Sequence, residues 1–197
     1  MKLYDLEPSG NCYKVRLFCA LANITLDLVP VDFMAGEHKT AKFLSMNPLG
    51  ELPILQDGDL TLRDSQAILV YLASQYGGEA WLPKDPAHAG KVMQWLSTAA
   101  NNVQHGPGDA RLVDLFGYKI DKATTIANSN AILPIFESHL SKNNWLEMGR
   151  VTIADCACFP YIALSHEGGI SLQPYPNIRA WIARIKALPN FIGMPGV

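Results

Sequence analysis

Roughly the first eighty residues alternate between short apolar runs and turn residues in the order of a small α/β domain. Lys2–Leu6 suits a short strand, and Pro8–Asn11 ends it with residues typical of turns and helix caps. A helix beginning within residues 9–11 is predicted by apolar residues at helical spacing, namely Val15, Phe18, Cys19 and Ala22. Leu26–Phe33 favours a strand, and Pro30 inside it indicates an edge strand. This pattern predicts a parallel β-α-β unit.

A polar connector and a hairpin follow that unit. The connector covers residues 35–40, and a short amphipathic segment ends at residues 47–50. Leu52–Gln56 and Leu60–Leu62 are apolar runs on either side of Asp57-Gly58. An Asp-Gly pair between such runs is the strongest short-range hairpin signal. The sequence therefore predicts two antiparallel strands here.

The hairpin leads into a helix, a linker and a helical region. Asp64 and Ser65 can cap a helix that ends at Gly77-Gly78. Residues 1–78 are thus expected to form an α/β domain of order βαβ-ββα around a mixed four-stranded sheet. Residues 79–87 contain two prolines and are expected to be a linker. Residues 88–197 are expected to form an all-α domain.

Within the second domain, apolar residues recur at helical spacing in three stripes: Val92, Trp95, Leu96 and Ala99; Ile126, Leu133 and Phe136; Ile178, Trp181, Ile182 and Ile185. Pro134 predicts a kink in the second of these helices. Gly106-Pro107-Gly108 predicts a break in the helix that carries the polar stretch Asn101–Arg111. Thr152 and Asp155 have the spacing of a capping box at a helix start.

Composition narrows the classes of partner. The chain has 197 residues, of which 49% are hydrophobic and 17% charged, and its formal net charge is −2. That balance gives no electrostatic reason to expect nucleic acid or an anionic membrane as partner. The first five residues include an acid and show no signal peptide, and no apolar run reaches the roughly 20 residues that span a bilayer. We therefore expect a soluble cytoplasmic protein.

The four cysteines do not form a metal or dithiol motif. No Cys-x-x-Cys pair occurs, and no histidines cluster beside them, so we expect no metal. Cys19, Cys156 and Cys158 lie in apolar helical surroundings, where a buried inert thiol is the common outcome. Cys12 differs because it lies at the start of the first predicted helix, where a thiol's pKa is lowered.

Two segments have features of a site for an amino-acid-like ligand. A cis Leu52-Pro53 bond would free the N–H and C=O of Leu52 to pair with an extended peptide, whereas a trans proline would only start an edge strand. Asp64 and Ser65 stand at a helix N-terminus, which favours a carboxylate. Ser65 adds a hydroxyl and Asp64 a charge for an ammonium, so the pair suits an α-amino acid head group. The alternative is an ordinary N-cap.

A third segment suits a thiolate. Ser9-Gly10-Asn11-Cys12 places hydroxyl and amide donors at the start of a helix. Lowering a thiol pKa from about 8.5 by about 1.5 units requires roughly 2 kcal/mol. One hydrogen bond to a charged group supplies roughly 1.5–3 kcal/mol. A single donor with the helix terminus is therefore sufficient, without a metal or a general base.

Taken together, these features resemble the cytosolic glutathione S-transferase superfamily, and closely its bacterial members. The resemblance rests on the order of five motifs along the whole chain: Ser9-Gly10-Asn11-Cys12, Gly50-Glu51-Leu52-Pro53-Ile54-Leu55, Asp64-Ser65-Gln66-Ala67-Ile68, Trp81-Leu82-Pro83-Lys84-Asp85-Pro86, and Thr152 with Asp155. It implies a thioredoxin-like N-terminal domain, an all-helical C-terminal domain and a homodimer. It also implies glutathione as cosubstrate and an electrophilic small molecule as second substrate.

The resemblance also implies roles for single residues. Pro53 matches the family's cis-proline, so Leu52 would bind the cysteinyl part of glutathione. Asp64 and Ser65 would hold the γ-glutamyl group, with Asp in place of the more usual Glu. His38 and Lys39 lie where relatives bind the glycine carboxylate, or are solvated loop charges. Thr152 and Asp155 match a structural folding motif.

The thiol-activating residue is left open by the resemblance. Ser9 lies at the activating serine of theta- and delta-like classes, and Asn11 at the asparagine of the Nu-like bacterial class. Cys12 suits a redox role or packing, and Tyr4 is expected to lie in the core. The electrophile site is expected near Asn102, His105, Arg111 and Tyr118. Conjugation, glutathione-dependent disulfide or peroxide reduction, and binding alone are the three functions considered.

Overall fold

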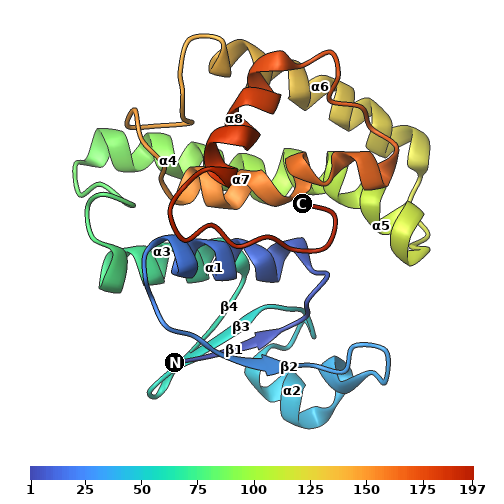
Figure 1. Ribbon diagram of the computed structural model, residues 1–197. Coiled ribbons are helices and arrows are strands. Elements are labelled where there is room, and N and C mark those ends of the chain that lie inside the picture. The colour runs from blue at the N-terminus through green and yellow to red at the C-terminus, as the bar shows by residue number, and fades with distance from the viewer.

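The computed structural model describes residues 1–197, and its N-terminal part is an α/β domain (Figure 1). Its elements follow in this order: β1 (Lys2–Asp5), α1 (Gly10–Leu21), β2 (Asp27–Pro30), η1 (Glu37–Lys39), α2 (Ala41–Met46), β3 (Ile54–Asp57), β4 (Leu60–Arg63), α3 (Ser65–Leu72) and η2 (Ala73–Gly77). The expected βαβ-ββα order is confirmed, with two short helical segments in the connector.

The sheet has the strand order β2-β1-β3-β4. β1 pairs in parallel with β2 and antiparallel with β3, so the sheet is mixed, as expected. β2 is an edge strand, and Pro30 is its last residue, opposite Asp5. β3 and β4 form the predicted hairpin, in which Gly58 has φ +57°, a left-handed conformation that glycine adopts without a steric penalty.

The helices α1 and α3 lie between the sheet and the C-terminal domain, whereas α2 lies beyond the other side of the sheet (Figure 1). α1 packs on α7, where the rings of Tyr13 and Phe159 have centroids 6.3 Å apart. A Cβ atom at Gly10 would lie 2.5 Å from Cε1 of Tyr161, so only glycine permits this close approach. The start of α1 is therefore held directly against the second domain.

The C-terminal part is all helical: α4 (Pro86–Thr98), η3 (Ala99–Gly108), α5 (Asp109–Phe116), α6 (Lys122–Leu140), α7 (Ile153–Ala163), η4 (Ser165–Gly168) and α8 (Pro176–Lys186). α4 begins inside the expected linker because Asp85 caps it and Pro86 is tolerated in a first turn. None of the helices is long and apolar enough to cross a membrane.

Proline and glycine interrupt these helices differently from one another. The expected break near Gly106 is present, since Gly106 has φ −101° and ψ −105° inside η3. At Pro134, where the sequence predicts a kink, α6 continues without a non-helical residue, so the helix is not broken there. Pro134 and Asn130, whose carbonyl the proline leaves without a helical partner, are both exposed. Water can therefore satisfy that carbonyl, although the contact of the proline ring with the preceding turn remains.

The segment after α8 returns across the domain boundary to the C-terminus (Figure 1). The buried hydroxyl of Tyr13 donates a hydrogen bond of 2.6 Å to the carbonyl oxygen of Ile192. Met194 is buried near the end of the same segment. The C-terminal segment thus helps to hold the two domains together.

Candidate functional site

Ser9 is the N-cap of α1 and keeps its hydroxyl hydrogen available. Its backbone is extended, with φ −77° and ψ 119°, and its Oγ accepts a hydrogen bond of 3.3 Å from the N–H of Cys12. A serine hydroxyl has two acceptor positions and one donor. Because the capping bond uses only an acceptor position, the O–H can donate to a thiolate placed at this helix terminus.

Asn11 connects three elements beside Ser9. Its Oδ1 accepts hydrogen bonds from Lys14 Nζ at 2.8 Å and from Ser65 Oγ at 3.4 Å. Its Nδ2 donates a hydrogen bond of 3.4 Å to Oε1 of Gln104. Gln104 lies in η3 of the second domain. Asn11 therefore holds the starts of α1 and α3 against the C-terminal domain, and its amide is largely occupied.

Lys14 is a completely buried cation that contacts the side chain of Asn11. Burial lowers the pKa of its ammonium to about 8, and the nearby Asp64 carboxylate opposes that shift. The ammonium lies 5.1 Å from the centre of the Tyr161 ring, in a cation–π arrangement. At neutral pH most of the Lys14 side chains remain charged, which makes the adjoining surface favourable for an anion.

The Leu52-Pro53 peptide bond is cis. The N–H and C=O of Leu52 take part in no hydrogen bond of the chain, and Leu52 is partly exposed just before β3. Both groups are consequently available to an extended ligand lying along this edge.

Asp64 and Ser65 form the start of α3. Asp64 has φ +73°, and its Oδ1 accepts hydrogen bonds from the N–H groups of Gln66 and Ala67 at 2.9 and 3.0 Å. Asp64 is exposed, and its Oδ2 accepts no hydrogen bond within the chain. Ser65 is buried, and its Oγ lies 2.8 Å from Oε1 of Gln66. Asp64 therefore caps α3 with Oδ1 and keeps Oδ2 available for another partner.

His38 and Lys39 lie in η1 and differ in how they are held. The ring of His38 stacks on Phe33 with centroids 3.9 Å apart, and its buried Nδ1 has no partner. Burial and the charge of Lys39 lower the pKa of His38. The ammonium of Lys39 donates to the carbonyl oxygens of Leu49 and Gly50 at 3.1 and 3.0 Å. Lys39 therefore ties the connector to the loop before Pro53.

Cys12 does not have the lowered thiol pKa that its place in the sequence predicts. Its side chain is fully buried, and burial raises the pKa of the thiol to about 12, although the hydrogen bond with Ser9 opposes this rise. Desolvation of the thiolate outweighs the helix N-terminus because the side chain points into the core. A reactive Cys12 thiolate has no support in the structure.

Native protein is expected to resist thiol-specific reagents, since all four cysteines are buried and free. Burial raises the pKa of each thiol above its ordinary value, which removes both access and the reactive thiolate. Labelling with a chromogenic disulfide should release almost no thiolate before denaturant is added and four equivalents afterwards. Rapid labelling of Cys12 in the native state would contradict this expectation.

Two of the four residues expected at the electrophile site line the same surface hollow. Asn102 and His105 line a surface hollow between η3 and α6 that includes neither Arg111 nor Tyr118. Arg111 is 2% exposed and is bound to Glu167 and to the carbonyl oxygen of Pro8, so it is not free to receive a substrate. Tyr118 is exposed, beyond the end of α5. The prediction failed for Arg111 because its partners are distant in sequence.

Lys14 and Gln104 were missed at the sequence level. Lys14 lies three residues after Asn11 and four before Phe18, so helical spacing places it on their face, although a lysine is expected to be exposed. Gln104 stands in a polar stretch with no feature that distinguishes it from its neighbours. Tyr4, which was expected in the core, donates to Oε1 of Gln56 at 3.1 Å within the sheet.

Comparison with protein families and known sequences gives one consistent result. Residues 1–74 match the family model "Glutathione S-transferase, N-terminal domain", and residues 88–189 match "Glutathione S-transferase, C-terminal domain". Glutathione S-transferase F13 of Arabidopsis thaliana is 33% identical over 212 residues, which cover 100% of this chain and 96% of that protein. Glutathione S-transferase 3 of Zea mays is 31% identical and covers 97% of this chain and 91% of that protein.

Solved structures agree with the sequences. The glutathione S-transferase of Pseudomonas fluorescens has a TM-score of 0.92 and 30% identity, with 98% of both chains covered. That of Xanthobacter autotrophicus has a TM-score of 0.90 and 28% identity, with 99% of this chain and 97% of that chain covered. Both the thioredoxin-like domain and the helical domain are matched. The chain therefore belongs to the glutathione S-transferase family.

Proposed function

We propose that this protein is a glutathione transferase in which Ser9 activates the glutathione thiol for attack on an electrophilic small molecule. The observation that carries this proposal is the free donor hydrogen of Ser9 at the N-terminus of α1. A thiolate there would accept that hydrogen and lie at the positive end of the helix dipole. Asn11 organises the neighbouring side chains, whereas Ser9 is the donor to the sulfur.

Glutathione would lie across the N-terminal domain in three parts. The N–H and C=O of Leu52 suit the peptide groups of its cysteine, as an added strand. Ser65 and the N-terminus of α3 suit the γ-glutamyl carboxylate, with the buried cation of Lys14 behind them. The free Oδ2 of Asp64 suits the γ-glutamyl ammonium.

The glycine end of glutathione would meet η1. We propose that His38 and Lys39 of η1 lie beside the glycine carboxylate and that Lys39 also shapes the loop before Pro53. The ammonium of Lys39 would supply positive charge for that carboxylate.

The proposed localisation and oligomeric state are those typical of the glutathione S-transferase family. We propose a cytoplasmic homodimer that uses no metal ion, since one hydroxyl donor and a helix terminus supply the energy needed to ionise a thiol. Four free cysteines suit a reducing compartment.

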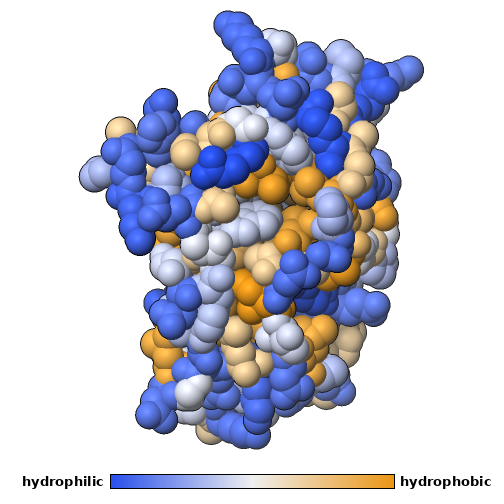
Figure 2. All heavy atoms as spheres, turned by 60° about the vertical axis from the view of Figure 1, so that its left-hand side comes forward, coloured by the Kyte–Doolittle hydropathy of each residue, from blue (hydrophilic) through white to orange (hydrophobic).

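Three exposed apolar side chains on α4 and α6 suit burial against a second copy of the chain: Met93, Ile126 and Ile135. Figure 2 views the molecule from the side on which α3 and α4 lie in Figure 1, and hydrophobic residues are visible on that face. Sedimentation of the full chain distinguishes dimer from monomer.

Titration calorimetry with reduced glutathione tests the binding part of the proposal. Wild-type protein is expected to bind glutathione, and Ser65→Ala is expected to weaken binding about tenfold to a hundredfold, because one hydrogen bond to a charged group is lost. Ser74→Ala, which changes an exposed serine without a side-chain hydrogen bond, is the matched control and should bind like wild type. Absence of binding by the wild type at millimolar glutathione would refute the proposed function.

A further inference from the structure

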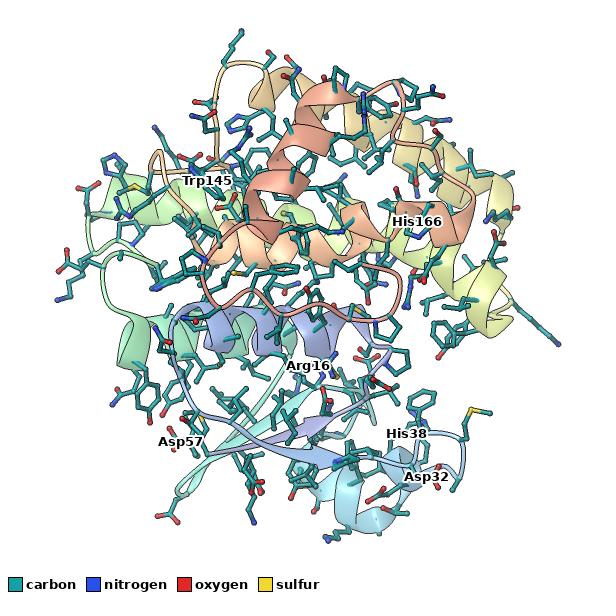
Figure 3. All side chains as sticks on the ribbon, viewed as in Figure 1. Arg16, Asp32, His38, Asp57, Trp145 and His166 are labelled. Atoms are coloured by element: carbon teal, nitrogen blue, oxygen red, sulfur yellow. The ribbon has the colours of Figure 1, made fainter.

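The loop that carries Ser9 is held from two sides by arginine side chains. Arg16 in α1 donates to Oδ2 of Asp5 at 2.5 Å and to the carbonyl oxygen of Glu7 at 2.8 Å. Figure 3 shows Arg16 beneath α1, on the side of the sheet. On the other side, Arg111 in α5 donates from Nη1 to the carbonyl oxygen of Pro8 at 2.9 Å. Pro8 directly precedes Ser9.

Arg111 is itself fixed by an acid of the second domain. Its Nε donates to Oε2 of Glu167 in η4, the residue after His166, which is labelled in Figure 3. The guanidinium also lies 5.2 Å from the centre of the Phe116 ring. The side chain of Arg111 is only 2% exposed and that of Glu167 is 18% exposed. Together these contacts hold the buried guanidinium of Arg111 in one orientation.

We propose that Arg111 is a positioning residue for the thiol-activating serine, which it holds through the carbonyl oxygen of Pro8 while Glu167 fixes its guanidinium. This inference rests on the proposed role of Ser9. It differs from a substrate-binding role because the guanidinium is committed within the protein. It also makes the geometry of the thiolate site depend on how the C-terminal domain is docked.

The physical reason is the direction of the Ser9 hydroxyl. A hydrogen bond weakens steeply when its donor angle falls below about 120°. The orientation of the peptide plane between Pro8 and Ser9 depends on the ψ angle of Pro8 and the φ angle of Ser9. Arg111 fixes this plane because it donates to the carbonyl oxygen of Pro8. Without this restraint, Ser9 would sample positions in which its hydroxyl no longer points at the sulfur.

The test is the ultraviolet titration of the thiolate of glutathione bound to full-length protein. Ser9→Ala sets the scale and should raise the pKa of the bound thiol by about 1 to 2 units. Arg111→Met combined with Glu167→Met removes both charges together, so no unpaired buried charge remains. This double variant should raise the pKa of the bound thiol by about half a unit to one unit, with glutathione affinity changed less than threefold.

Two further variants separate positioning from folding. Arg150→Met is the matched control, since Arg150 also donates to two backbone carbonyls, of Glu79 and Ala80, but lies far from Ser9 in the chain. It should leave the pKa of the bound thiol unchanged. Arg111→Lys keeps the charge but lacks the planar fork that reaches both partners, and it should shift the thiol pKa in the same direction as the double variant.

The outcomes are distinguishable. If Ser9→Ala raises the pKa of the bound thiol while the folded double variant and Arg111→Lys both leave it at the wild-type value, the positioning role is wrong and the proposed function stands. If the double variant does not fold, the Arg111→Lys result decides. If Ser9→Ala has no effect, the proposed function fails and the positioning role fails with it.

Discussion

Replacing Ser9 with alanine is expected to lower the rate of glutathione conjugation at neutral pH by about 10- to 150-fold. The change removes one hydrogen bond to a charged sulfur, worth roughly 1.5–3 kcal/mol, and each 1.36 kcal/mol corresponds to a tenfold change. Glutathione affinity should change little, because Leu52, Asp64 and Ser65 remain. The rate loss should shrink as pH rises past the pKa of the free thiol, since ionisation then needs no donor. The measurement is the pH dependence of kcat/KM with a generic aromatic electrophile.

A cap-loss control is needed because Ser9 also caps α1. Losing an N-cap costs about 1 kcal/mol of stability by itself. Asp85→Ala removes the side-chain acceptor that caps α4 at the N–H of His88, 3.0 Å away, and should leave the rate unchanged. Ser9→Thr keeps the hydroxyl and should retain most of the activity. A Ser9→Ala enzyme that conjugates glutathione at the wild-type rate would exclude Ser9 as the activating residue.

Replacing Asp155 with alanine is expected to destabilise the protein by about 3–5 kcal/mol. The fully buried carboxylate accepts hydrogen bonds from Leu146 N at 3.1 Å, Thr152 N at 2.9 Å and Trp181 Nε1 at 2.9 Å. Each buried donor left without a partner costs roughly 1–3 kcal/mol, with incomplete additivity. Burial raises the pKa of Asp155 to about 6, against the effect of these donors, so the group is mostly ionised at neutral pH. Denaturant-induced unfolding measures the loss.

Asp121 provides the comparison for Asp155. It caps α6 by accepting from the N–H of Thr124 at 3.1 Å, but it is exposed. Asp121→Ala should therefore cost only about 1 kcal/mol, since water replaces the carboxylate. Asp155→Asn should fall between the two variants, because its one remaining side-chain oxygen can still serve Leu146 and Trp181 but not Thr152. Equal losses for Asp155→Ala and Asp121→Ala would mean that the buried capping box does not hold α7 and α8 together.

The fold was predictable from sequence where local signals are strong. Asp57-Gly58 between apolar runs, Pro30 in an edge strand, and the spacing of Thr152 and Asp155 each depend on residues close in the chain. Pro134 does not end α6, which continues through it without a non-helical residue. The close approach of Gly10 to Tyr161 depends on tertiary packing, which the local sequence does not describe.

In the candidate site, too, local features were predictable from sequence and contacts between distant residues were not. The helix starts at Ser9 and Asp64 could be predicted because a helix N-cap is a local feature, whereas the roles of these residues toward glutathione stay predictions. Arg111 was misassigned and Gln104 missed, because their partners are about a hundred residues away, at Pro8 and Asn11. For Cys12, the lowered thiol pKa predicted from its place at a helix start is wrong, because desolvation in the core raises the pKa more than the hydrogen bond with Ser9 lowers it.

We propose that the N-terminal domain holds glutathione with its thiol ionised by Ser9. The most direct measurement is the ultraviolet titration of the thiolate in the complex of wild-type protein with glutathione. We expect a midpoint at or below about pH 7, that is about 1.5 units or more below the value of about 8.5 for a free thiol. A bound thiol that titrates at the free value, in a protein that binds glutathione, would contradict it.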